Sequence, residues 1–210
     1  MHFMSQLILI PFLLALSGNV LADLFLSLTL PEPLPPHPSR RWLRGLRWVS
    51  CTAALIGLVL LHASLPTLVV FTLFSITAAT DLESTYLPPD AFMLGSTTLG
   101  LGLAFIQSGW PGLLDAVVAE AMCFAVLVFV VAFTGVCDSG DIKLGMQFGV
   151  AAGSLSQVFV GVMGMWLAMV IVLVMYLAYS RSPKAIRTRR IPQGPLAWIG
   201  LLLAVIWRVR

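Results

Sequence analysis

The chain alternates long apolar stretches with short polar segments. Eight of these stretches are apolar enough to be membrane segments. A helix needs about 20 apolar residues to cross a bilayer, and a backbone in lipid must satisfy its own hydrogen bonds, so each stretch is expected to be helical. The strict alternation of apolar and polar positions that marks a membrane β-barrel is missing from the sequence. The predicted segments are approximately 5–30, 48–63, 66–80, 91–107, 113–134, 146–155, 157–179 and 195–208.

Some apolar stretches are too long for one helix, and small residues or prolines mark where they divide. Pro66 divides residues 48–80, so we expect two helices joined by a tight turn near 62–66. Residues 146–179 are also too long for one span, and Gly149, Gly153 and Ser154 allow a turn between a short helix that ends at about 155 and a longer one that begins at about 157. The N-terminal stretch is predicted to be a membrane helix and not a cleaved signal peptide, because no Lys or Arg precedes it and no small-x-small cleavage site follows it.

Composition supports the same fold class. Of the 210 residues, 59% are hydrophobic and 10% are charged, whereas soluble domains carry about 25% charged residues. We therefore predict an all-α polytopic membrane protein, with residues 1–210 forming a single membrane-embedded domain. The sequence has no Gly-rich phosphate loop and no basic-aromatic stripe, so the lipid bilayer is an expected partner and nucleic acid is not.

The placement of the basic residues predicts an orientation. The segments 31–47 and 181–194 hold nine of the twelve Lys and Arg residues, which marks both as cytoplasmic loops by the positive-inside rule. Six predicted segments lie between them and return the chain to the same side. The same count places the loops 81–90 and 135–145 in the cytoplasm and the N-terminus in the periplasm.

Cysteine and histidine usage predicts neither a metal site nor a cofactor. The three cysteines are Cys51, Cys123 and Cys137, and they form no CxxC pair, so a structural zinc site is not expected. Cys51 and Cys123 lie inside apolar stretches and are interpreted as small core residues. Cys137 has no histidine near it in sequence that would activate it as a nucleophile.

The acidic residues concentrate in two of the predicted cytoplasmic loops. Five of the nine acids lie there, namely Asp81, Glu83, Asp90, Asp138 and Asp141. Ordinary solvated loop acids are one explanation. The other is an aspartyl dyad formed by Asp81 and Asp141, because two neighbouring carboxylates share a proton near neutral pH. The ionised member then activates water as a general base, while the protonated member polarises a peptide carbonyl.

Three segments carry a resemblance to a known family. GDIKLGMQFGVAAG (140–153) contains Gly-Asp-x-Lys-Leu followed by spaced glycines, DLESTYLP (81–88) is an Asp with a Pro seven residues later, and IPQGP (191–195) precedes the last apolar stretch. In this order they resemble the motifs of type IV prepilin peptidases, aspartyl proteases of the GxGD class. These leader peptidases of pilus and type II secretion systems act in the bacterial inner membrane.

The resemblance implies an activity and a set of residues. It implies cleavage of a short basic leader from prepilins or pseudopilins at the cytoplasmic membrane face, by Asp81 and Asp141 and without a cofactor. An acidic cytoplasmic mouth would attract such a leader. Lys143 is expected either to pair with an acid or to lie at the interface. The residues expected to bind substrate or modulate the site are Gly140, Lys143, Asp138, Glu83 and Pro88.

Two departures from the family pattern are visible. Asp138 stands where the family has the first glycine of GxGD, which adds an acid beside the site. Many members also carry a large cytoplasmic insertion with two CxxC pairs and N-methylate the product. Here the corresponding segment is 31–47 and holds no cysteine. The chain therefore resembles a short form of the family, and the resemblance gives no support for methylation.

Two other functions remain open from the sequence. A small transporter or channel would use the same acids as a cation or proton path, but needs polar residues near the membrane midplane, where Glu120 is the one candidate. A catalytically inactive pilus-assembly factor is the other alternative, suggested by Asp138.

Overall fold

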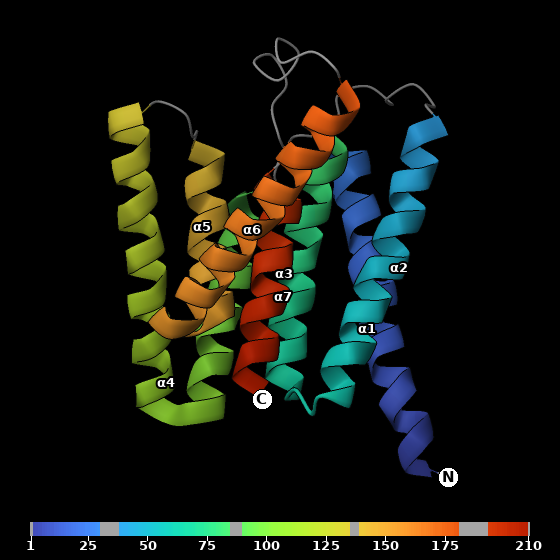
Figure 1. The fold of residues 1–210 in the computed structure, drawn as a ribbon. Helices are drawn as coiled ribbons and strands as arrows, with labels where there is room; N and C mark the ends of the chain where they lie inside the picture. Colours follow the sequence, from blue (N-terminus) through green and yellow to red (C-terminus); the bar gives the residue numbers. More distant parts are fainter. Residues whose placement is uncertain (1, 30–37, 85–89, 135–138, 181–192, 210) are drawn as a thin grey trace.

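The computed structural model describes residues 2–29, 38–84, 90–134, 139–180 and 193–209. Over these ranges the chain forms seven α-helices and no strand, which confirms the all-α prediction (Figure 1). The helices are α1 (His2–Thr29), α2 (Pro38–Leu60), α3 (Leu65–Ser84), α4 (Asp90–Thr134), α5 (Ser139–Ala152), α6 (Leu155–Ser180) and α7 (Gln193–Val209).

The predicted apolar segments coincide with these helices, except that α4 contains two of them. Its 45 residues bend at Gly109, which has φ 65° and ψ −153° and is followed by Pro111. The two limbs of α4 then run in opposite directions, joined at the lower edge of Figure 1. Glycine suits this bend because a residue without Cβ adopts positive φ without strain.

Four helices of the described chain are long and apolar enough to cross a membrane, which supports a membrane protein. Two shorter apolar helices, Leu65–Asp81 and Gln193–Val209, accompany them. The predicted count of about eight membrane segments is not confirmed by these helices and stays a prediction. The four long stretches are Leu9–Ser27, Trp42–Leu60, Asp90–Phe133 and Leu155–Met175.

Helix α3 lies at the centre of the bundle. It contacts α1, α2, α4, α5 and α7, and its residues 74–80 are all buried. Phe71 and Phe74 are among the largest fully buried side chains. Because this part of α3 is buried on every side by its neighbours, α3 is the element against which the other helices are positioned.

The turns between consecutive helices explain two of the predicted divisions. Helix α2 ends in a Schellman motif: His62 adopts φ 63°, its N–H bonds to Val59 O at 2.9 Å, and the Ala63 N–H bonds to Leu58 O at 2.9 Å. Helix α5 ends at Gly153, with φ 82°. Both positions agree with the turns expected from the sequence.

Parts of the segments predicted as loops are helical. Helix α2 begins at Pro38. Proline is favoured in the first turn of a helix, where a backbone N–H would have no partner. The arginines of 31–47 therefore lie on the first turns of α2. Helix α3 continues through Asp81 and Glu83 to Ser84. Helix α5 begins at Ser139, so the first part of the segment 140–153, which carries the family resemblance, is helical too.

A carboxylate site at one end of the helix bundle

The helix ends that carry the predicted site all face one end of the bundle. The C-terminal ends of α1, α3 and α6 and the N-terminal ends of α2, α5 and α7 point to the upper edge of Figure 1. Asp81 lies in the last turn of α3 and Asp141 in the first turn of α5. The fold therefore brings the two aspartates to the same end, although they are far apart in sequence.

The two aspartates also lie at the same height in the bundle. Helices α3 and α5 contact each other and run in opposite directions (Figure 1). Phe74 of α3 packs against Phe148 of α5, with ring centroids 5.9 Å apart. Asp81 follows Phe74 by seven residues and Asp141 precedes Phe148 by seven residues. At 1.5 Å per residue, both aspartates lie about 10 Å from this ring contact, in the same direction.

Asp81 is held against the N-terminus of α7. Its Oδ2 accepts a hydrogen bond of 2.6 Å from the Gly194 backbone N–H. A Cβ on Gly194 would lie 2.9 Å from both Cβ and Oδ2 of Asp81 and 2.9 Å from the Ala78 Cα. Only glycine permits this approach, which brings Asp81 at the end of α3 against Gly194 at the start of α7. A carboxylate at a helix N-terminus is stabilised by the free N–H groups and the helix dipole.

Asp141 is half-buried in the first turn of α5. An acid in this position is stabilised by the dipole of its own helix, so its place has a structural explanation independent of catalysis. Gly140 precedes it in the same turn and is half-buried as well. Both aspartates of the predicted dyad thus lie at helix N-termini, one on α5 and one against α7.

Lys143 pairs with an acid, which resolves one of the alternatives left open by the sequence. Its Nζ lies 2.6 Å from Asp90 Oδ1, and this ion pair joins the start of α5 to the start of α4. Both side chains are exposed, 42% for Lys143 and 79% for Asp90. An exposed pair contributes about 0 to 1 kcal/mol to stability, so its main effect is on how the two helix ends are positioned.

The remaining predicted residues are placed as follows. Glu83 lies in the last turn of α3. Pro88 and Asp138 lie outside the described residues. Glu120, the midplane candidate, lies in the second limb of α4 and is half-buried, where its Cα would be 2.8 Å from a Cβ on Gly149. Within the described chain, no group of three or more His, Cys, Asp or Glu side chains is arranged to hold a metal ion.

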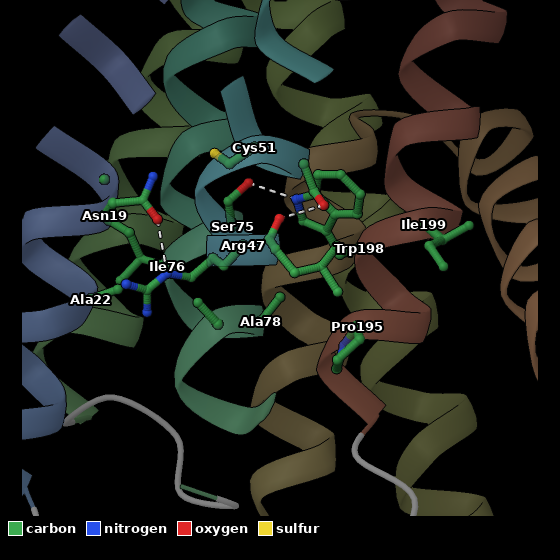
Figure 2. A pocket seen from close by; sticks show the side chains of 14 residues that line it. Asn19, Ala22, Arg47, Cys51, Ser75, Ile76, Ala78, Pro195, Trp198 and Ile199 are labelled. Atoms are coloured by element: carbon green, nitrogen blue, oxygen red, sulfur yellow. Dashed lines mark hydrogen bonds between the residues drawn. The ribbon is translucent and has the colours of Figure 1, made fainter. Parts of the chain in front are cut away.

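A half-open cavity of about 230 Å³ lies about one helical turn from Asp81, which is not part of its wall (Figure 2). It lies between α1, α2, α3 and α7, and its wall includes Ala78, one turn before Asp81, and Pro195, the residue after Gly194. Most of the wall is apolar. Trp198 closes one side, where its Nε1–H donates a 2.8 Å hydrogen bond to Ser75 Oγ. The cavity is suited to apolar side chains presented close to the Asp81 carboxylate.

Arg47 is a functional candidate that the sequence reasoning missed. It is 9% exposed and lines the same cavity. Its Nε–H donates to Asn19 Oδ1 at 2.8 Å (Figure 2), and its Nη2 donates to Asp23 Oδ1 at 2.7 Å. The sequence analysis took this arginine only as a topology signal. Asn19 and Asp23 are four residues apart and so lie on one face of an apolar helix. This spacing was the sequence signal that a basic side chain from another helix would bind to both of them.

Comparison with known proteins gives no family. No family model, no curated protein and no solved structure matches the chain. The activity therefore has to be argued from the chain's own residues and from the resemblance of its three short segments.

Proposed function

We propose that this chain is a membrane aspartyl endopeptidase that removes short basic leaders from type IV prepilins or pseudopilins. One observation carries the proposal: Asp81 in the last turn of α3 and Asp141 in the first turn of α5 lie at the same end of two contacting antiparallel helices. The contact of Asp81 with Gly194 adds support, because it joins two segments that carry the family resemblance.

The chemistry follows from a pair of carboxylates that shares one proton. The ionised member takes a proton from water as the water oxygen attacks the scissile carbonyl carbon, which opens the C=O π bond and gives a tetrahedral intermediate. The protonated member donates its hydrogen bond to the carbonyl oxygen and stabilises the developing negative charge. When the intermediate collapses, the C–N bond breaks and the carboxyl that took the proton from water passes it to the leaving amine. Both aspartates lie at helix N-termini, so neither environment alone selects the base, and the two roles belong to the pair. The mechanism requires no metal and no cofactor.

The cavity beside Asp81 gives the substrate a place to lie. In such prepilins an apolar helix follows the cut, and the mostly apolar wall between α1, α2 and α7 would take its first side chains. The basic leader would extend toward the end of the bundle where both aspartates lie. In this proposal the protein lies in the bacterial inner membrane with the site facing the cytoplasm.

The test is cleavage of a basic-leader prepilin that is co-expressed with the chain and followed by its shift in size. Wild type is expected to cleave, and Asp81→Asn and Asp141→Asn, which keep the side-chain shape, are expected to lose cleavage. Asp90→Asn is the matched control, because it removes an exposed acid from the same end, and it is expected to retain most of the activity. Cleavage by either dyad variant would overturn the assignment.

A transporter or channel is the alternative, and the half-buried Glu120 within a candidate membrane span is the observation that favours it. This function predicts proton or cation flux in reconstituted vesicles that Glu120→Gln abolishes and that the two dyad variants leave in place. Absence of cleavage by wild type together with such flux would replace the peptidase proposal. Absence of both would favour an inactive assembly factor.

A further inference from the structure

A second cavity lies at the opposite end of the bundle from the two aspartates. Its volume is about 270 Å³, and it is half-open. It forms where α3 begins, α4 bends, α5 ends and α7 ends, which is the lower edge of Figure 1. In contrast to the cavity beside Asp81, much of its wall is polar. The polar side chains that matter here are Gln107, Asp115, Gln157 and Arg208.

Two side chains of opposite charge, Asp115 and Arg208, line this cavity without forming an ion pair with each other. Asp115 lies about one turn beyond the bend of α4, and Arg208 lies in the last turn of α7. Within the described part of the chain, neither forms an ion pair or a side-chain hydrogen bond, whereas Asp23 and Asp90 at the other end are both paired. Gln157 adds a buried Oε1 that has no hydrogen-bond partner. A buried acceptor of this kind requires a donor from a ligand or from water, whereas the Asp115 and Arg208 side chains are exposed and open to a charged ligand.

Exposed tryptophans place the cavity at the level of the lipid headgroups. Trp110 lies at the bend of α4 and Trp207 directly before Arg208, and each is 67% exposed. Exposed indole rings at the ends of apolar helices are typical of the membrane–water interface. The cavity therefore opens where the charged parts of phospholipids lie, next to the apolar surface of the bundle.

We propose that this cavity binds the headgroup of an aminophospholipid, with the phosphate on Arg208 and the primary ammonium on Asp115. A headgroup with both charges satisfies the two unpaired side chains together, whereas an anionic headgroup would satisfy Arg208 and leave a like charge near Asp115. An ammonium with N–H groups also donates hydrogen bonds to the Asp115 carboxylate, which a quaternary ammonium cannot do. The volume is at the lower end of small-molecule sites, about 300 Å³, so the acyl chains remain outside along the apolar helices.

The test uses the full-length chain in phosphatidylcholine nanodiscs, to which phosphatidylethanolamine or phosphatidylglycerol is added. Lipid retention is followed by native mass spectrometry, and thermal unfolding is followed in parallel. Phosphatidylethanolamine is expected to be retained about tenfold more strongly than either other lipid, the value of one charge-assisted hydrogen bond, and to raise the unfolding temperature. Since this comparison needs only wild type, it holds even if a variant folds poorly.

Variants then assign the two poles. Arg208→Gln and Asp115→Asn are each expected to abolish the preference for phosphatidylethanolamine. Arg44→Gln, at the other end of the bundle, is the matched control and is expected to keep it. Equal retention of all three lipids, or an unchanged preference in both cavity variants, would overturn the proposal. Soluble glycerophosphoethanolamine that binds as tightly as the lipid would show that the ligand is a free headgroup and overturn the lipid assignment.

Discussion

The Oδ2 atom of Asp81 accepts a 2.6 Å hydrogen bond from the backbone N–H of Gly194, 113 positions away in the chain. The bond fixes the end of α3 against the start of α7. It also means that the carboxylate at the centre of the proposed site is oriented by backbone and not by a mobile side chain. Its position therefore depends on how closely the two helices approach, and that approach depends on the missing Cβ of Gly194.

Gly194→Ala is expected to destabilise the fold and reduce leader cleavage. The new Cβ would lie 2.9 Å from Asp81 Oδ2 and from the Ala78 Cα, so α7 has to move at a cost of about 1 to 3 kcal/mol. Gly57→Ala is the matched control, because its Cβ meets nothing within 4 Å, and replacing a helical glycine stabilises by about 0.5 to 1 kcal/mol. Free energies of unfolding measured in detergent check this; equal values for the two variants would contradict it.

Arg47→Ala is expected to lower the free energy of unfolding by about 1 to 3 kcal/mol, the cost of leaving a buried hydrogen-bonding group such as Asn19 without its partner, because Asp23 is 38% exposed and stays partly hydrated. The change leaves Asn19 Oδ1 and Asp23 Oδ1 without the donors that they now have from Arg47. Arg44→Ala serves as the control, because its side chain is 54% exposed and lies 3.8 Å from Asp23, a contact worth less than about 1 kcal/mol. Denaturant unfolding of both variants measures the difference, and similar losses would show that the burial of Arg47 carries no weight.

The hydrophobic pattern of the sequence was sufficient to predict where the helices lie along the chain, but not which side chains they bring into contact. Apolar length and the breaks at Pro66 and Gly153 located the helices and two of their turns, because these features act locally on the backbone. The placement of the polar segments also predicted that Asp81 and Asp141 lie at the same end of the bundle, as they do. The hydrogen bond from Gly194 to Asp81 could not be predicted from the sequence, because it depends on the approach of two helices that are distant in the chain. The burial of Arg47 was missed for a related reason: α2 begins at Pro38, earlier than the apolar pattern does.

The buried amide of Gln147 gives a prediction with opposite signs for two variants. Its Nε2 donates to Ser96 Oγ at 2.7 Å, while its Oε1 is buried and has no hydrogen-bond partner among the residues that the structure describes. Gln147→Leu removes that unpaired oxygen, and Ser96 keeps its 2.9 Å bond to Met93 O, so stability is expected to stay the same or rise. Ser96→Ala removes the hydroxyl to which the Gln147 amide donates and is expected to cost about 1 to 3 kcal/mol. Thermal unfolding distinguishes the two, and a larger loss for Gln147→Leu would contradict this account.

Variants of Lys143 show whether this residue takes a direct part in cleavage or only positions the start of α5. In the fold, Lys143 pairs with Asp90 across two helix ends, so we expect it to act on the site through the placement of α5. Lys143→Gln and Asp90→Asn should then lower leader cleavage to the same small extent, and the double variant should be no worse than either, because both remove one interaction. Initial rates of cleavage with a purified prepilin measure the three variants. A loss with Lys143→Gln that Asp90→Asn does not share would mean that the lysine acts directly on the substrate or on the carboxylate pair, and not through α4.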